Sequence, residues 1–375
     1  MRLIGKAAHW IAGLLPAKKY IVFESVPDLS DNTKAVYDEM IHQGLHHKYK
    51  MLWLVRGRKE NLPVLPNTFY IRQDTWLTQK ICKWVTLRAK CLICCNAFLE
   101  TQTPSQTSFY LTHGTALKKL NAYVLPENVS YTVVASEHTK PVMAKELCGD
   151  ISTFHALGYP RNDVFHQPQL DLHSVLEGDF QKVVVWYPTF RQHKNGLRTA
   201  SANALPVLHE TETAMHLNEI ARENDILIVI KPHFAQDVSY IKDYCLSNIR
   251  FIDDSFFAQH KTTSYAFVGS CDALITDYSS IYFDYLLCDK PVAVIWEDID
   301  DYRKNPGFAM EPEYYMKGAQ KIYHLADFER FLRDLKDGND VLKNERSEIN
   351  QLVNYSSDGK NSERVVDFIR EKAKL

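Results

Sequence analysis

The chain has 375 residues, of which 45% are hydrophobic and 24% charged, and this length and composition favour a globular protein of two domains. The net charge of −2 argues against a generally basic nucleic-acid binder, and no apolar run is long enough to span a membrane. The charge is uneven, because residues 1–125 hold 17 Lys and Arg against 8 Asp and Glu. This basic first third predicts a local anionic partner.

The N-terminal segment, residues 1–20, combines apolar and basic residues and contains no acidic residue. It leads directly into an apolar run, which argues against a secretory signal and favours a helix lying in the headgroup plane of a membrane. Residues 75–90 repeat the pattern. The alternative for each segment is an ordinary helix that packs on a sheet and exposes a basic face. Together the segments favour contact with an anionic membrane surface, made by Arg2, Lys6, Trp10, Lys18, Lys80, Lys83 and Trp84.

Apolar, strand-like runs alternate with helical patterns through the first part of the chain. This alternation predicts a mostly parallel sheet with helices on both faces. Cys91, Cys94 and Cys95 lie in one of the runs, and no second Cys or His pair stands at zinc-ribbon spacing, so a buried strand is favoured over a metal or redox site. The helical patterns lie at 31–43 and 139–149, and the strand-like runs at 20–25, 51–57, 90–96, 108–114 and 131–136.

The pattern loosens at 164–180, which reads as a linker, and a second series of strand-like runs follows it. We therefore predict an α/β protein of two doubly wound, Rossmann-like domains. The runs of the second series lie at 182–188, 226–233, 249–253, 272–277 and 291–296. The predicted domains cover residues 1–165 and 166–345, and residues 346–375, part of a final helix at about 340–373, are expected to pack back on the first domain.

Polar residues follow four of these predicted strands. In doubly wound sheets ligands bind outside the carboxyl ends of the strands, so we expect these residues to line one cleft. Side chains of these kinds commonly transfer protons or bind phosphates. They are His113 and Gly114 after the first strand, Thr189 and Arg191 after the second, Lys231 and His233 after the third, and Thr276, Asp277, Ser279, Ser280 and Asp284 after the fourth.

The stretch 276–280 connects a buried strand to a short helix and has two interpretations. Asp277 or Ser279 caps a helix that begins near Ser280, or the hydroxyl groups of the stretch also bind a diphosphate. Asp284 either faces the same site or packs in the interior. No G-x-G-x-x-G or Walker motif is present, so a dinucleotide oxidoreductase or a P-loop ATPase is not supported. We favour a phosphate site.

Five motifs in order, LTHGTALKKL, ALGYPRND, YPTFR, IKPH and ITDYSSIYFDY, resemble the CDP-glycerol glycerophosphotransferases of wall teichoic acid synthesis, and YIVFESVPDLSDNTKAVYDEM is similar to that family too. The resemblance implies a GT-B fold whose two domains face each other across a cleft, with the CDP-alcohol in the C-terminal domain. It implies transfer of glycerol phosphate, or a related polyol phosphate, to a hydroxyl of a polyprenyl-diphosphate-linked saccharide with release of CMP. The chain lacks the long N-terminal extension of the polymerising members and so resembles the short primase. Phe234 stands where a proline is common, and the polyol stays open.

Within this resemblance His113 is the histidine of the family's HG motif and the expected general base, because an alcohol needs a base at neutral pH and histidine titrates near it. Glu137 either orients His113 or begins a solvated helix. His233 matches the family's second histidine, and Lys231 and Arg191 would stabilise the charge of the departing nucleotide. The alternatives are a core or capping role for each histidine and a solvated loop for Arg191.

Asp277 has no second carboxylate beside it, so we expect neither a metal nor another cofactor. Arg161, Asn162 and Asp163, in the motif ALGYPRND, either serve the site or build an interdomain turn.

The expected partners are CDP-glycerol or a related CDP-alcohol, a lipid-linked saccharide acceptor and an anionic membrane surface, without nucleic acid. A lipid-linked acceptor cannot leave the bilayer, so the protein is expected as a peripheral, monotopic protein on the cytoplasmic face of the cell membrane. Two other interpretations stay open. One is a GT-B nucleotide-sugar glycosyltransferase, and the other is a non-catalytic protein that binds a cell-wall polymer or a lipid.

Overall fold

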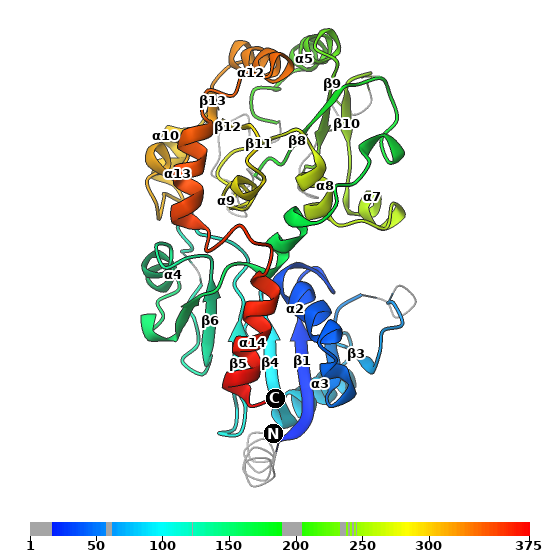
Figure 1. The fold of residues 1–375 in the computed structure, drawn as a ribbon, viewed down its shortest axis with the longest axis vertical. Helices are drawn as coiled ribbons and strands as arrows, with labels where there is room; N and C mark the ends of the chain where they lie inside the picture. The colour runs from blue at the N-terminus through cyan, green and yellow to red at the C-terminus, as the bar shows by residue number, and fades with distance from the viewer. Residues whose placement is uncertain are drawn as a thin grey trace. The chain divides into compact units, whose positions relative to one another are not determined.

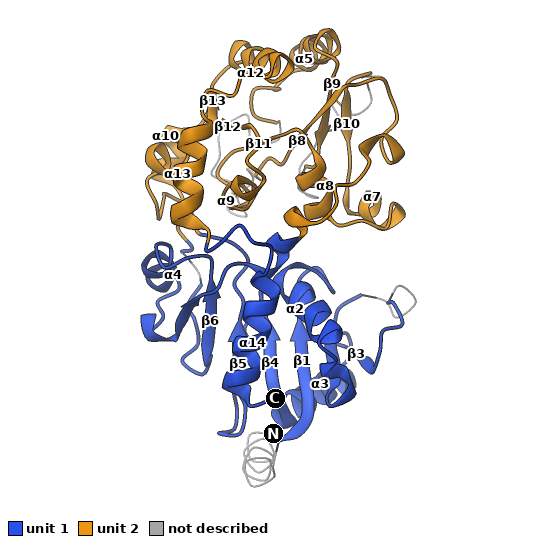
Figure 2. Ribbon diagram, viewed as in Figure 1, with its two compact units in different colours: residues 1–115, 120–163, 355–375 blue, residues 116–119, 164–354 orange. Residues whose placement is uncertain are grey.

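The computed structural model describes residues 17–57, 62–121, 123–189, 205–232, 238, 241, 244 and 246–375. The chain divides into two units, each with its own parallel sheet (Figures 1 and 2). The first unit contains Met1–Thr115, Leu120–Asp163 and Tyr355–Leu375, and the second contains Ala116–Lys119 and Val164–Asn354. The sequence placed the first boundary two residues later, between residues 165 and 166.

The first unit has a seven-stranded sheet in the order β3-β2-β1-β4-β5-β6-β7. This is the doubly wound order, in which the chain moves outward from β1 in one direction and then returns to β4 on its other side. Each of the five strand-like runs predicted here is a strand. The strands are β1 (Lys18–Glu24), β2 (Lys50–Val55), β3 (Thr68–Arg72), β4 (Ala89–Cys94), β5 (Thr107–Tyr110), β6 (Tyr131–Val134) and β7 (Phe154–Ala156).

Alternate residues of a strand point to opposite faces of the sheet, so the apolar strands of the first unit present apolar side chains on both faces. Helices pack on the sheet and bury these side chains. Phe23 and Trp53 on one face contact Tyr37 of α2 (Asp31–His42), with ring centroids 5.3 and 5.6 Å from that ring. The C-terminal helix α14 (Asn361–Ala373) packs beside α2 on the same core through Val365, Val366 and Ile369. Within the described residues of this unit, the other α-helices are α3 (Trp76–Arg88) and α4 (Lys140–Glu146).

The second unit has a six-stranded sheet in the order β10-β9-β8-β11-β12-β13, which is again doubly wound. All five predicted runs are strands, and the prediction of two Rossmann-like α/β sheets is confirmed. The strands are β8 (Lys182–Trp186), β9 (Ile226–Ile230), β10 (Ile249–Phe251), β11 (Ala273–Thr276), β12 (Val292–Ile295) and β13 (Gln320–Ile322). The helices include α5 (Thr211–Glu223), α7 (Asp254–Gln259), α8 (Ser264–Ser270), α9 (Ile281–Tyr285), α10 (Ile299–Lys304), α11 (Pro312–Tyr315), α12 (Leu325–Asp337) and α13 (Lys343–Val353).

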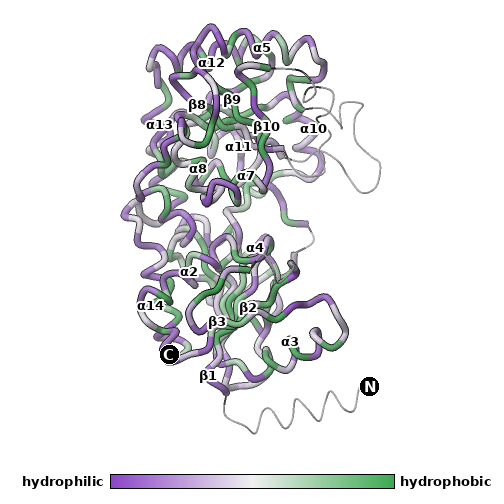
Figure 3. The backbone as a smooth tube through the Cα atoms, turned by 90° about the vertical axis from the view of Figure 1, so that its right-hand side faces the viewer, coloured by the Kyte–Doolittle hydropathy of each residue, from purple (hydrophilic) through white to green (hydrophobic). Residues whose placement is uncertain are grey.

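The distribution of hydrophobic residues along the chain explains which strands could be predicted from the sequence. The central strands carry continuous hydrophobic stretches, whereas helices such as α3 mix hydrophobic and hydrophilic residues (Figure 3). Three strands were missed, and each lies at the end of a sheet. β3 is half-exposed, and β7 and β13 have three residues each with polar residues among them, so none contains an apolar run that stands out. β10 is equally short and also ends a sheet, but the predicted run 249–253 revealed it.

The prediction of one final helix at about 340–373 is wrong. Residues 354–360 separate α13 from α14, and Gly359 in this connection has a φ of 67°, a conformation that a continuous helix does not contain. The connection also crosses the boundary between the units, since Asn354 belongs to the second and Tyr355 to the first. Of the predicted C-terminal segment 346–375, residues 346–354 therefore belong to the second unit.

The cysteine cluster lies in a buried strand, as predicted. Cys91 and Cys94 belong to β4, Cys95 follows it, and all three are buried free thiols. Burial raises the pKa of Cys95 to about 12, because the interior disfavours the charged thiolate. The cluster therefore contributes apolar packing to the sheet.

Candidate functional site

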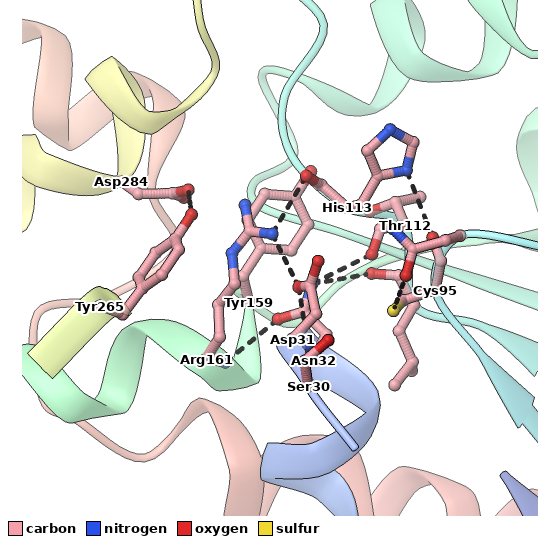
Figure 4. Close-up of polar contacts among 12 residues, drawn as sticks. Ser30, Asp31, Asn32, Cys95, Thr112, His113, Tyr159, Arg161, Tyr265 and Asp284 are labelled. Atoms are coloured by element: carbon pink, nitrogen blue, oxygen red, sulfur yellow. Dashed lines mark hydrogen bonds and ion pairs between the residues drawn. The ribbon is translucent and has the colours of Figure 1, made fainter. Parts of the chain in front are cut away.

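His113 lies in the first unit, in the loop that follows β5 (Figure 4). The ring is half-buried, and its Nδ1 atom is 3.3 Å from the carbonyl oxygen of Cys95. Because a carbonyl oxygen only accepts hydrogen bonds, Nδ1 is the donor, and in the neutral ring Nε2 then carries the lone pair. This is the arrangement that a general base requires.

The backbone around His113 has an uncommon conformation. Thr112 has a φ of 47° and Gly114 a φ of 137°, both in the region that L side chains rarely adopt. Gly114 meets this demand without strain, whereas Thr112 is β-branched and is disfavoured there. The neighbouring structure must therefore hold the loop in place.

Two residues far away in the sequence contact this loop, and a third pairs with one of them. The side-chain amide of Asn32 donates to the carbonyl oxygens of Leu111 and Thr112, at 3.3 and 3.1 Å. Nη1 of Arg161 donates to the carbonyl oxygen of His113 at 3.1 Å and to Oδ1 of Asp31 at 2.7 Å (Figure 4). Sequence reasoning missed Asp31 and Asn32 and left the role of Arg161 open. The only available signal was that both segments occur in motifs similar to the family.

Glu137 pairs with a neighbouring lysine at the start of α4. Its side chain is 73% exposed and pairs with Lys140 at 3.5 Å, which fits a solvated helix start. The contact described for Nδ1 of His113 is with the backbone carbonyl of Cys95. Orientation of His113 by Glu137 stays an untested prediction.

In the second unit Asp277 brings two predicted strand ends together. Its carboxylate accepts hydrogen bonds from the backbone N–H and the hydroxyl of Thr189, at 2.9 Å for the N–H, and from the N–H of Tyr278 at 2.6 Å. Thr276 donates through its hydroxyl to the carbonyl oxygen of Tyr187 at 2.8 Å. β8 and β11 are adjacent in the sheet where the strand order reverses, which is the usual ligand position in this fold.

The capping interpretation of residues 276–280 is wrong. Helix α9 begins at Ile281 with Ser280 as its N-cap, but no side chain forms a capping hydrogen bond. The Asp277 carboxylate accepts hydrogen bonds from Thr189 and from the N–H of Tyr278, which precede α9 in the chain. The half-exposed side chains of Ser279 and Ser280 remain the candidates for ligand contact in this stretch.

Asp284 is buried and accepts a hydrogen bond of 2.7 Å from the hydroxyl of Tyr265, which favours the packing interpretation for it (Figure 4). Lys231, directly after β9, pairs with Asp254 at 3.0 Å, and its Nζ lies 5.8 Å from the centre of the Tyr187 ring. Its cation is thus held beside the end of β8. Arg191 and His233 lie outside the described residues.

Nearly the whole chain matches a known protein family. A family model described as CDP-glycerol:poly(glycerophosphate) glycerophosphotransferase matches residues 8–371. The chain belongs to this family. The resemblance carried by the five motifs is confirmed.

Relatives within the glycerophosphotransferase family act on different polyols. The chain is 25% identical to the teichoic acid ribitol-phosphate primase of Bacillus spizizenii over 256 residues, which are 64% of this chain and 59% of the primase. It is 24% identical to the teichoic acid poly(glycerol phosphate) polymerase of the same organism over 332 residues, 79% of this chain and 78% of that protein. The family therefore includes teichoic acid glycerol-phosphate and ribitol-phosphate transferases.

A solved structure of another protein has the same fold as this chain. A variant of the wall teichoic acid polymerase TagF superposes with a TM-score of 0.73 at 21% identity, covering 98% of this chain and 93% of that one. The same variant has been determined after a soak with CDPG. The likeness establishes a two-domain, GT-B-like α/β fold for this chain, as the resemblance implied.

The predicted membrane-contact residues divide into three groups. Arg2, Lys6 and Trp10 lie outside the described residues. Lys18 is the first residue of β1, so its assignment to an N-terminal helix is wrong. Lys80, Lys83 and Trp84 belong to α3. This helix also exposes large apolar side chains, namely Trp76 at 66%, Leu77 at 59%, Ile81 at 42% and Trp84 at 47%. Among the described residues, no helix has the length and apolar character to cross a bilayer.

Proposed function

We propose that this protein transfers glycerol phosphate, ribitol phosphate or a related polyol phosphate from a CDP-alcohol to a hydroxyl of a lipid-linked saccharide and releases CMP. The observation that carries the proposal is the family match over residues 8–371, which includes both His113 and the Asp277 region. The geometry of His113 supports it, since the hydrogen bond from Nδ1 to Cys95 leaves the lone pair on Nε2.

The proposed reaction exchanges one bond to phosphorus for another. The acceptor oxygen attacks the phosphorus that carries the polyol, and the bond from this phosphorus to the oxygen of CMP breaks. Nε2 of His113 takes the proton of the acceptor hydroxyl, and CMP leaves with the bonding electron pair. Transfer of this kind depends on positioning and on stabilising the phosphate charge.

We assign the donor side of the reaction to the second unit. Lys231 would supply a cation to the diphosphate, and the hydroxyls of Ser279 and Ser280 would donate hydrogen bonds to it. Asp277 fixes the backbone and hydroxyl of Thr189 and so shapes the donor site indirectly. The predicted roles of the remaining residues stay part of the proposal: Arg191 and His233 would bind the donor phosphates, and Gly114 of the first unit would allow a substrate to approach His113 closely.

A comparison of donors tests the function. The purified protein is incubated with a lipid-linked disaccharide analogue and with CDP-glycerol, CDP-ribitol or a UDP-sugar in separate reactions. The proposal expects CMP release and a phosphodiester-linked product with at least one CDP-alcohol. Release of UDP instead would identify a nucleotide-sugar glycosyltransferase, and turnover of no donor would favour a non-catalytic binding protein.

We also propose that the protein works as a peripheral protein on the cytoplasmic face of the membrane, with α3 lying against the anionic surface. The exposed apolar and basic side chains of α3 support this placement, and Lys80 lies over the Trp76 ring at 3.8 Å. A lipid-linked acceptor requires an enzyme that reaches the bilayer.

Replacing Lys80 and Lys83 with glutamate is expected to weaken binding to vesicles that contain phosphatidylglycerol by more than about tenfold, since each cation near an anionic surface contributes on the order of 1 kcal/mol. Co-sedimentation measures the change. Lys304→Glu combined with Lys343→Glu is the matched control, because it alters net charge equally at exposed sites of the second unit. Equal binding of both double variants would rule out α3 as the contact.

A further inference from the structure

We propose that Arg161, together with Asp31 and Asn32, is a positioning group that holds the His113 loop in its active conformation. The inference rests on the proposed function, in which His113 is the general base. It concerns residues that touch neither the substrate nor the reacting atoms. They act through the backbone of His113 and its neighbours.

The side chain of Arg161 ends at the loop. It is only 7% exposed, and Nη1 shares its hydrogen bonds between the carboxylate of Asp31 at 2.7 Å and the carbonyl oxygen of His113 at 3.1 Å (Figure 4). The charge of Arg161 is compensated by Asp31, whose side chain is 17% exposed. A paired arginine in this position orients the peptide group of His113 without placing a net charge beside the ring.

Asn32 completes the connection from the other side. Its amide nitrogen donates to the carbonyl oxygens of Leu111 and Thr112, and its Oδ1 accepts from the backbone N–H of Arg161 at 3.1 Å. One buried side chain thus links the loop after β5 to the loop after β7. Because amide N–H and carbonyl groups buried without partners are costly, these bonds favour one arrangement of the two loops.

The backbone conformations of two residues in this network explain why the loop needs stabilising contacts. Thr112 and Asp31 are non-glycine residues with φ values of 47° and 60°, and both lie in this network. Residues in this region persist only where the surrounding contacts hold them. Without the side chain of Arg161, the carbonyl oxygen of His113 loses its donor, and the peptide group next to the strained Thr112 is expected to rotate and move the His113 ring away from the Cys95 carbonyl.

Arg161→Met tests the inference. Misplacement of a catalytic group by about 1 Å costs on the order of 100-fold in rate, so kcat for CMP release should fall by about that factor. KM for the CDP-alcohol should stay unchanged, because the proposed donor residues belong to the second unit. Asp31→Asn removes the charge but keeps an oxygen acceptor for Nη1, and its loss in kcat should be smaller.

Arg364→Met is the matched control. Arg364 also lies in the first unit, pairs with Asp358 at 2.7 Å and donates to a backbone carbonyl, that of Leu157, at 3.3 Å. The Arg364→Met variant should have the kcat of the wild type. If Arg161→Met retained the kcat of the wild type, or if both arginine variants lost activity equally, the positioning role would be wrong.

Nitrogen NMR of histidine-labelled protein separates this inference from the proposed function. The wild type is expected to show neutral His113 protonated at Nδ1, assigned by loss of the signal in His113→Gln. In Arg161→Met the two tautomers should mix, because the contact with Cys95 is lost. If no CDP-alcohol yields CMP, the proposed function fails, while the tautomer still reports on positioning. An unchanged tautomer in Arg161→Met overturns the inference even if the enzyme is active.

Discussion

His113→Ala is expected to lower kcat for CMP release by about 100- to 10,000-fold, the range that a positioned general base contributes. The acceptor alcohol keeps its proton at neutral pH, so without Nε2 of His113 the attacking oxygen remains a weak nucleophile. The half-buried ring contacts the carbonyl oxygen of Cys95, and the backbone contacts of the loop stay in place after truncation. The fold should therefore survive the substitution.

The measurement compares CMP release with thermal unfolding of the same preparation. His42→Ala serves as the control, since His42 is a largely exposed histidine of the same unit and pairs only with Glu39 of its own helix among the interactions described for it. This variant should match the wild type. A folded His113→Ala protein with wild-type kcat would show that another group is the base.

Asp277→Ala is the second large effect that we expect. Removing the carboxylate leaves the buried N–H of Tyr278 and the half-buried N–H of Thr189 without their acceptor, which should lower the free energy of unfolding of the second unit by about 2–4 kcal/mol. The Thr189 segment also loses its anchor. We expect KM for the CDP-alcohol to rise about tenfold, the equivalent of one hydrogen bond to a charged group.

The opposite end of the same strand provides the control for this prediction. Asp272 directly precedes β11, and its carboxylate accepts from the N–H of Val183 at 2.8 Å. Asp272→Ala should therefore lower stability in a similar way and leave KM unchanged, because the amino ends of the strands lie away from the proposed donor site. Equal KM values for the two variants would contradict a donor site near Asp277.

The central strands of both sheets were readable because burial leaves a local mark. The runs around Phe23, Cys91, Val184 and Ile275 are apolar without interruption, and such runs occur where a strand is covered on both faces. The same logic placed Asp277 and Thr189 at strand ends, where the structure joins them by hydrogen bonds. The edge strands β3, β7 and β13 left no such mark.

By itself, the sequence determined the two parallel sheets, the family, and the position of His113 directly after a strand. The sheets and the position of His113 follow from the local pattern of apolar and polar residues, and the family follows from its resemblance to five ordered motifs. Only the tertiary structure decided that Arg161 and Asp31, 130 residues apart, pair beside His113, that residues 354–360 interrupt the last helix, and that Asp277 holds Thr189 instead of capping α9. Hydrogen bonds between distant segments depend on the path of the whole chain, and no local pattern encodes that path.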